Sequence, residues 1–316
     1  MSQPDTATQT ATFSDAPTRT DEMHDALDDW IADLLAETTT AHASDAFQRW
    51  LDVQSQFHDY SARNALLISL QCPDATHVAG YRTWQTEFDR QVSEGESAIW
   101  IWAPITAKVC PACGKPKSSH NDDCESDGVP YTDWSSQLRS FKPVPVFDVS
   151  QTTGESLPSL ETATYGDASG LVPILCAAAE SLGVDVSLVS PSEWVHGAAR
   201  GVCEFPQGHR PSVAVRQRPN EADMATTLVH EVAHGLLHAD RTILPERSLR
   251  EVEAEAVAYL VGRQFGLDVC NSAFYLAAWA GEDADSVLER LNRIRSVTVS
   301  ILGAIDDAVG GNQRVR

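Results

Sequence analysis

The sequence is short of basic residues, and of lysine above all. Its 316 residues include 45 Asp and Glu but only 23 Lys and Arg, and the formal net charge is −22. Both halves share the deficit, since residues 1–160 hold 24 acidic and 10 basic residues and residues 161–316 hold 21 and 13. A carboxylate-rich surface stays hydrated and dispersed in concentrated salt. The composition therefore resembles that of halophilic proteins, and it leaves little counterion release for nucleic acid unless basic residues cluster locally.

Long apolar runs are also lacking. No stretch approaches the roughly 18 consecutive apolar residues of a membrane-spanning helix, so no membrane partner is expected. The N-terminus has neither the basic nor the apolar region of a signal peptide. Residues 1–20 are rich in Thr, Ser, Asp and Pro, which predicts a disordered acidic tail. Seven cysteines in such a chain favour reduced thiols and metal ligation over disulfides, which is typical of the cytoplasm.

The rest of the chain divides into two parts, which predicts an α+β fold with two domains. Residues 21–157 begin with helical periodicity and later show two strand patterns, at 98–103 and 141–147, separated by a polar stretch over 106–137 with little periodicity. Residues 158–316 combine a small mixed sheet with a helical C-terminal part. The strands expected in this second part lie at 184–189, 199–205 and 212–216, and its helices at 171–182, from 221 onward, at 247–265 and through about 308.

Two histidines four residues apart, His230 and His234, give the clearest functional signal. They belong to the sequence HEVAH on a predicted helix that Asn220 caps. A spacing of four places both imidazoles on one helix face, so both can reach one ion. Glu231 projects toward the same cleft, where it can take a proton from water and deliver it to a leaving amine. The motif predicts a zinc metallopeptidase with one catalytic Zn²⁺.

A third ligand is expected from the next helix, where Glu251, Glu253 and Glu255 compete. On ideal helical geometry Glu251 and Glu255 share a face, whereas Glu253 points about 160° away from either. Glu251 could bind the metal while Glu255 orients a histidine from the second shell, whereas Glu253 could supply only a ligand. The spacing favours Glu251 and leaves Glu253 open. His238 lies about 12 Å along the axis from the first histidine and is not expected to share its ion.

A second candidate metal site lies in an insertion at residues 108–126. Cys110, Cys113, His120 and Cys124 have the spacing CxxC-x6-H-x3-C. A CxxC pair followed by a His and a Cys is typical of a closed, tetrahedral structural zinc site. Such an ion would order a polar insertion that has no core of its own. The alternative is three reduced loop cysteines without a metal.

Several segments together resemble known families. HEVAHGLLH followed by REVEAEAVAYLVGRQFGLD resembles the metallopeptidase-like domains of the ImmA/IrrE and ArdC anti-restriction groups. YSARNALLISLQ at 60–71, ATHVAGYRTWQ at 75–85 and PVPVFDVSQT at 143–152 resemble the N-terminal domain of the ArdC group. The resemblance covers about residues 40–308. The cysteine insertion does not belong to that family pattern.

The resemblance implies a domain that binds single-stranded DNA followed by a gluzincin-like zincin domain. In related zincins the first Glu of an ExEAD motif is the ligand, which supports Glu251, although Glu255 stands where Asp or Asn is usual. Single strands are held by basic grooves with stacking aromatic residues, so Tyr60, Arg63 and Trp84 are the candidate DNA contacts.

The resulting hypothesis is a zinc metallopeptidase that acts on a peptide or protein, held by strand addition along Val213–Val215. The alternative is a single-stranded-DNA-binding anti-restriction protein whose zincin domain is not proteolytic. The sequence does not indicate the oligomeric state.

Overall fold

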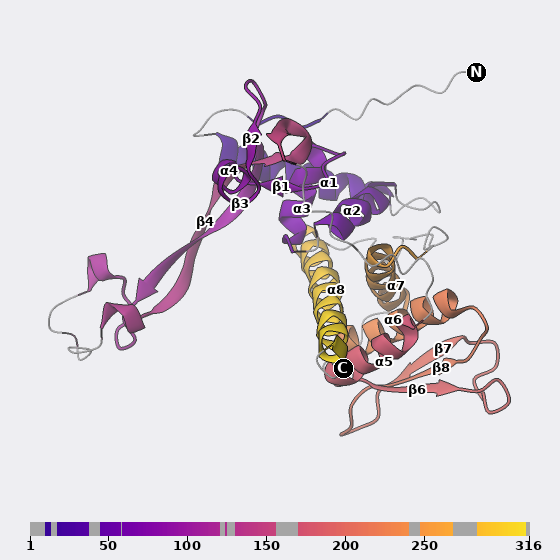
Figure 1. Ribbon diagram of the computed structural model, residues 1–316. Coiled ribbons are helices and arrows are strands. Elements are labelled where there is room, and N and C mark those ends of the chain that lie inside the picture. Colours follow the sequence, from indigo (N-terminus) through magenta and orange to yellow (C-terminus); the bar gives the residue numbers. More distant parts are fainter. Residues whose placement is uncertain are drawn as a thin grey trace, which may run out of the picture.

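The structure is a computed structural model that describes residues 10–13, 18–37, 45–57, 59–120, 124, 130–155, 170–239, 247–267 and 283–313. Helices and three small sheets make up this described part, which agrees with the expected mixed α+β class. In Figure 1 the N-terminal helices lie at one end of the long C-terminal helix α8 (Ala284–Gln313), the second half of the chain surrounds its other end, and a two-stranded hairpin extends away from both. No helix in the described ranges has the length and apolarity that a bilayer-spanning segment needs.

Three helices open the fold: α1 (Arg19–Glu37), α2 (Asp45–Gln56) and α3 (Ala62–Gln71). Ser61 caps α3 by accepting a hydrogen bond from the Asn64 amide. Of the predicted 1–20 tail, residues 1–9 and 14–17 lie outside the described residues. The Ala11 amide donates to the Leu70 carbonyl at 2.9 Å, and α1 begins within the predicted tail, at Arg19.

A long antiparallel hairpin follows, made of β3 (Ile99–Val109) and β4 (Ser135–Asp148). At its base, β1 (Val78–Ala79) pairs with β4, and β2 (Arg90–Val92) pairs with β5 (Thr152–Gly154) beside α4 (Tyr81–Glu87). Short 3₁₀ turns η1 (Lys117–Ser119) and η2 (Tyr131–Asp133) lie at the hairpin tip, and η3 (Val149–Gln151) follows β4.

The two predicted strands, 98–103 and 141–147, are longer than expected and extend into both ends of the polar stretch 106–137. The pairing of β3 with β4 continues from Ile99↔Val146 to Val109↔Ser135, past a register shift at Ile105/Thr106. Most residues in this outer part of the hairpin are exposed. A ribbon with solvent on both faces needs no alternation of polar and apolar residues, so the usual sequence signal of a strand was missing.

The second half forms α5 (Leu171–Ser181), the strands β6 (Asp185–Val189), β7 (Gly201–Glu204) and β8 (Ser212–Arg216), and the helices α6 (Glu221–His238) and α7 (Arg247–Gln264). The strand order is β6-β8-β7, with β6 parallel and β7 antiparallel to β8, which is the small mixed sheet expected from the sequence. Because β8 lies in the middle, β7 has one free edge among the described strands.

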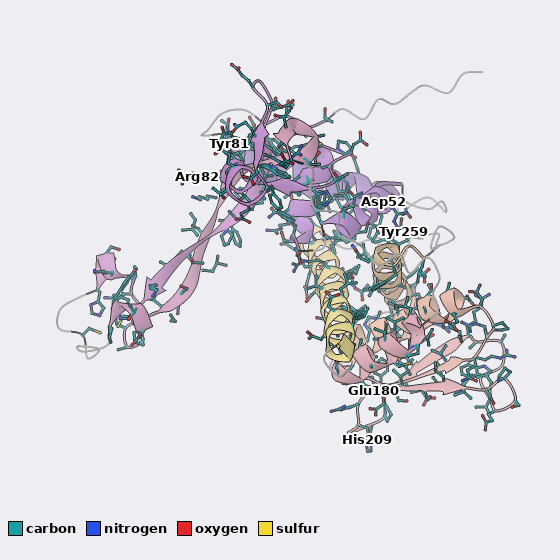
Figure 2. All side chains as sticks on the ribbon, in the orientation of Figure 1. Asp52, Tyr81, Arg82, Glu180, His209 and Tyr259 are labelled. Carbon is teal, nitrogen blue, oxygen red and sulfur yellow. The ribbon has the colours of Figure 1, made fainter. Side chains whose placement is uncertain are left out.

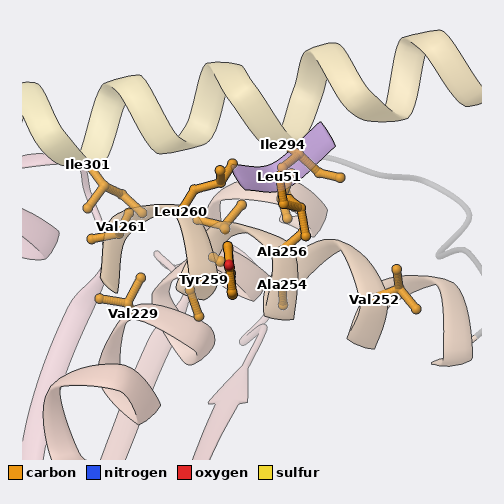
Figure 3. Close-up of a cluster of buried hydrophobic side chains, with 14 of the residues drawn as sticks. Leu51, Val229, Val252, Ala254, Ala256, Tyr259, Leu260, Val261, Ile294 and Ile301 are labelled. Carbon is orange, nitrogen blue, oxygen red and sulfur yellow. The ribbon is translucent and has the colours of Figure 1, made fainter. Parts of the chain in front are cut away.

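One cluster of buried side chains joins the two halves. Leu51 of α2 packs with side chains of α7 and α8 such as Leu260 and Ile294 (Figure 3). Polar contacts reinforce this junction: the Tyr259 hydroxyl donates to Asp52 at 2.5 Å, and Figure 2 shows the two residues together where α2 meets α7. The predicted boundary at 157/158 lies outside the described residues. The two predicted domains therefore share a core in the described part of the chain.

Candidate metal centre

Helix α6 positions both histidines of the HEVAH motif. Its first turn is fixed by Asn220, whose side chain accepts a hydrogen bond from the Asp223 amide at 3.1 Å. Apolar residues of the same helix, such as Leu228 and Val232, are buried against the core, so the helix cannot rotate. The imidazoles of His230 and His234 meet edge to face, with ring centroids 4.8 Å apart.

Three donor atoms converge at this point. The Nε2 atoms of His230 and His234 are 3.2 Å apart, and Oε2 of Glu251 on α7 lies 3.5 and 3.6 Å from them. In a tetrahedral site with bonds of about 2.0–2.1 Å, two ligand atoms are separated by about 3.3–3.4 Å. The three atoms therefore already form the base of such a site. Its remaining position faces the exposed side, because the Glu251 side chain is 48% accessible.

The structure brings Glu251, and not Glu253, to the histidine pair. Glu253 has no solvent exposure, and one of its oxygens accepts hydrogen bonds from Arg290 at 2.8 Å and Arg293 at 2.6 Å, both on α8. Its other oxygen lies 3.8 Å from Nε2 of His238. Helix α7 thus presents Glu251 to α6 and turns Glu253 toward α8. His238 lies with this buried group.

Glu255 contacts His230 at the ring nitrogen that does not face Glu251. Its Oε2 atom lies 3.0 Å from Nδ1 of His230, whose Nε2 faces Glu251. This is the arrangement expected of the two carboxylates spaced four apart. A carboxylate on Nδ1 places the imidazole proton there and leaves Nε2 free to bind a cation.

The carboxylates around the histidines determine the protonation of the metal-free site. Burial opposes a charge on His230, but Glu251 and Glu255 outweigh it and raise the pKa of His230 to about 9. Hydrogen bonds to His230 and His234 hold the pKa of Glu251 far below its usual range. Without a metal, His230 and Glu251 are thus an ion pair at neutral pH. A cation that binds there must displace a proton.

Glu231 lies between the donor triad and the sheet. Burial, together with the charge of Glu251, raises the pKa of Glu231 against the opposing effect of the two histidines. A Cβ atom on Gly201, the first residue of β7, would lie only 2.7 Å from Cγ of Glu231 and 2.8 Å from Cγ2 of Thr227. The glycine therefore lets the free-edged strand approach the acid closely.

The prediction that Val213–Val215 binds an extended peptide by strand addition is wrong. These residues belong to β8, whose two edges are occupied by β6 and β7. A central strand has no free main-chain groups for strand addition. The free edge beside Glu231 belongs to β7, a strand that the sequence predicted at nearly the right position without indicating its place in the sheet.

The four residues of the cysteine insertion also come together, at the tip of the β3–β4 hairpin. Cys110, Cys113, His120 and Cys124 each offer one atom to a cluster whose members lie within 4.8 Å of one another. The sulfur atoms of Cys110 and Cys124 are 3.7 Å apart. That separation is too long for a disulfide and matches the roughly 3.8 Å between two sulfurs bound at 2.3 Å to one tetrahedral zinc.

The backbone around Cys110 and Cys113 has the form of a metal-binding knuckle. The Gly114 amide donates to the Cys110 carbonyl, and the Cys110 amide donates to the Lys115 carbonyl, both at 2.9 Å. Gly114 has φ +68°, in the left-handed region that glycine adopts without strain. A tight turn of this kind points both sulfurs to one side.

The residues predicted to contact DNA separate into two groups. Trp84 is 1% exposed, and its indole N–H donates to the Phe147 carbonyl at 2.9 Å, so the prediction that it stacks with a base is wrong. Tyr60 and Arg63 line an apolar cavity of about 790 Å³ at the base of the hairpin, together with Trp102 and Phe141. Trp84 was indistinguishable from a surface aromatic because helix α4 is too short to show which of its faces is buried.

Comparisons with known proteins add a likeness but no family membership. No protein-family model matches the chain. An uncharacterized protein of Bacillus anthracis is 24% identical over 289 residues, which cover 83% of this chain and 48% of that protein, so the chain spans about half the length of this curated relative. The antirestriction protein ArdC from the R388 plasmid is structurally similar over most of the chain. Its metal-free crystal structure has 15% identity and a TM-score of 0.47, and covers 84% of this chain and 99% of its own. Its Mn(II)-bound structure has 15% identity and a TM-score of 0.46, and covers 83% and 98%.

Proposed function

We propose that the chain is a zinc-dependent peptidase whose metal is held by His230, His234 and Glu251. The observation that carries the proposal is the triangle of donor atoms, with sides of 3.2, 3.5 and 3.6 Å, beside the half-buried Glu231. Two imidazoles and one carboxylate with an open fourth position are typical of catalytic zinc sites. When bound, zinc supplies a Lewis acid that polarises a carbonyl and activates water.

The chain's own residues would perform the proton transfers and hold the substrate. Glu231 would accept a proton on its carboxylate and pass it to the nitrogen of the leaving amine, a task suited to a carboxyl whose pKa burial has raised. An extended peptide would pair with the free edge of β7 through main-chain hydrogen bonds. Gly201 would keep the distance between that strand and Glu231 short. Reduced cysteines, all six of the described ones being free of disulfides, fit the cytoplasmic location that the sequence predicts.

The test compares a Glu231→Gln variant with a Glu221→Gln variant, which changes an exposed glutamate of the same helix. Cleavage of fluorescent casein and of a mixed peptide library is measured at low and at molar salt, with bound metal determined on the same samples. We expect Glu231→Gln to keep its metal and to lose at least about 10²-fold in rate, since a general base contributes that much or more. Undiminished cleavage in this variant would contradict the proposal.

Metal identity is tested by loading chelator-stripped protein with Zn²⁺ or Mn²⁺. Manganese is included because ArdC of plasmid R388 has a Mn(II)-bound crystal structure. A site with two imidazole ligands binds zinc more tightly than manganese in the usual order of divalent metals. We expect zinc to displace manganese at equal concentrations. The reverse order would overturn the assignment of zinc.

A second candidate function is the binding of single-stranded DNA at the base of the hairpin. The cavity there has the features of a stacking site: the half-buried ring of Trp102, the 56% exposed ring of Phe141, and the exposed guanidinium of Arg63. Stacking on an aromatic side chain is worth about 1–3 kcal/mol per base and does not depend on long-range charge attraction. This suits an acidic chain better than a basic groove would.

Filter binding of labelled single strands at low and at molar salt tests this candidate. Phe141→Ala removes an exposed ring of the cavity, and Phe205→Ala removes a 37% exposed ring elsewhere as its matched control. We expect Phe141→Ala to weaken retention by about 5- to 150-fold, from the stacking energy of one base. Glu231→Gln should bind as the wild type does. Retention that is absent at both salt concentrations would eliminate the candidate.

A further inference from the structure

All four lysines of this acidic chain lie on one hairpin. Lys108, Lys115, Lys117 and Lys142 fall between β3 and β4 or within them, and Arg139 of β4 adds a fifth cation. Over residues 108–142 the sequence has five basic and five acidic residues, in a chain of net charge −22. Four of those acidic residues (Asp122, Asp123, Glu125 and Asp127) lie outside the described residues. Asp133 is the acidic residue of this stretch that the structure describes.

Two of the lysines meet at one aromatic ring near the tip. The Nζ atoms of Lys108 and Lys117 lie 5.5 and 5.2 Å from the centroid of the Tyr131 ring, which is 46% exposed. Lys108 is held in place by the Thr132 carbonyl at 2.7 Å. Both lysines line a concave surface of about 500 Å³, which also carries the hydroxyl groups of Ser118 and Ser136. Cations, hydroxyl donors and a partly exposed aromatic ring therefore lie together at the tip.

The tip has too little apolar material to hold this arrangement by itself. Its buried aromatic residue, Trp134, is 8% exposed and packs against His120 and Tyr131 with ring centroids 4.9 and 5.2 Å apart. A core of this size does not stabilise a short segment unless a bound metal, a disulfide or a similar cross-link also constrains it. His120 is one of the four residues of the Cys110–Cys124 cluster, so a metal there would fix Trp134, and through it Tyr131, in place.

The hairpin carries this site away from the acidic body. It projects as a separate arm in Figure 1, and eleven strand residues at about 3.4 Å each give it a length of about 35 Å. Charges in solution are screened beyond about 8 Å at physiological ionic strength. A polyanion at the tip is therefore shielded from the carboxylates of the body, which would repel it at the body's own surface.

We propose that the tip of the β3–β4 hairpin, fixed by a metal on Cys110, Cys113, His120 and Cys124, binds the phosphate backbone of a nucleic acid through Lys108 and Lys117. Phosphate oxygens accept hydrogen bonds from the ammonium and hydroxyl groups of the concave surface. The Tyr131 face offers stacking to a base in a single strand. A two-stranded ribbon also has the width that the major groove of duplex DNA admits. An acidic peptide would use the lysines but would leave the aromatic face without a partner.

The test uses the whole chain and labelled DNA of about 20 nucleotides, single-stranded or duplex. The double variant Lys108→Gln/Lys117→Gln is compared with Arg82→Gln/Arg210→Gln, which removes two exposed cations elsewhere. Anisotropy titrations over a range of salt concentrations give both the affinity and its salt dependence. We expect the lysine variant to bind at least 10-fold more weakly at low salt. Its log–log salt slope should fall by about 1.8 for duplex or about 1.4 for single strands, as two lost phosphate contacts predict.

A second variant, Cys113→Ser, tests the role of the metal. We expect it to lose one bound metal per chain and most of the DNA affinity, while the lysine variant keeps its metal. Four outcomes would overturn the proposal. In the first two, the wild type binds neither DNA, or the Arg82→Gln/Arg210→Gln control loses as much affinity as the lysine variant. In the other two, the protein binds polyglutamate, used as an acidic competitor, more tightly than DNA, or Cys113→Ser keeps full DNA affinity after losing its metal. Peptide cleavage, and the effect of Phe141→Ala on DNA retention, are measured separately. If either of those proposals fails, the comparison of the lysine variant with its control still tests the hairpin tip.

Discussion

Nδ1 of His230 lies 3.0 Å from Oε2 of Glu255, one helical turn along α7 from Glu251. The two carboxylates of one helix face thus contact opposite nitrogens of the same imidazole. A carboxylate that hydrogen-bonds the outer nitrogen of a metal-binding histidine typically contributes 10- to 100-fold to metal affinity. We expect Glu255→Gln to weaken zinc binding at this centre by that factor. Competition with a chromophoric chelator measures it, with the exposed Glu289→Gln as control. An unchanged affinity would remove Glu255 from the site.

Gly201 is expected to tolerate no side chain. Its φ is not in the left-handed region, so alanine fits the backbone, but the added Cβ would lie 2.7 Å from Cγ and 2.9 Å from Oε1 of Glu231. A displacement of about 1 Å in a catalytic group can cost about 10²-fold in rate. Gly201→Ala should therefore lose cleavage by about that factor and keep its metal. Gly303→Ala, where a Cβ meets nothing within 4 Å, is the control. Equal rates in both variants would be the adverse result.

Glu253 is expected to stabilise the fold without binding the metal. Its fully buried carboxylate accepts hydrogen bonds from Arg290 and Arg293, so Glu253→Gln leaves two cations without their counter-charge. Breaking a buried ion pair on one side costs about 3–5 kcal/mol. We expect the free energy of unfolding in denaturant to fall by about that amount, with the metal content of folded protein unchanged. The exposed control Glu289→Gln should change the free energy of unfolding by less than about 0.5 kcal/mol. Metal loss from a folded Glu253→Gln variant would reinstate Glu253 as a ligand.

Asp148 makes the stability of the hairpin base depend on pH. Burial works against its charge, yet four hydrogen bonds, from the Thr76, His77 and Ser150 amides and the Ser150 hydroxyl, hold the pKa of Asp148 below its ordinary value. Above about pH 4 the carboxylate is ionised in both the folded and the unfolded chain, so its stabilisation is fully present. As the pH falls below 4, the unfolded chain takes up the proton first, and the contribution is lost as the pH passes through the folded-state pKa.

The Asp148→Asn variant measures this contribution. We expect it to lower the free energy of unfolding by about 1.5–3 kcal/mol at neutral pH, the range for hydrogen bonds to a charged group. The difference from the wild type should shrink in denaturant titrations below about pH 4. Asp306→Asn, at an exposed position of α8, should show neither effect. A difference that stays constant from pH 7 to pH 3 would show that the charge of Asp148 is not involved.

Local patterns in the sequence were sufficient where chemistry depends on neighbours along the chain. The spacing of His230 and His234, the cap at Asn220 and the spacing of Cys110 and Cys113 are each set within a few residues of the chain. Those features were predicted with their residues, because a helix or a tight turn fixes side-chain directions over such distances. The helices at 171–182 and 247–265 were predicted for the same reason and appear as α5 and α7.

Only the tertiary structure decided which neighbour each of these side chains meets. The spacing favoured Glu251 but left Glu253 open, and the packing of α7 between α6 and α8 turns the first to the histidines and the second to Arg290 and Arg293. The place of β8 in the middle of its sheet excluded Val213–Val215 as a docking edge. The length of the exposed hairpin could not be predicted from the sequence either, because its outer part lacks the alternation of polar and apolar residues. In each case the deciding contact joins residues distant in sequence, and no local periodicity records which face of an element meets which partner.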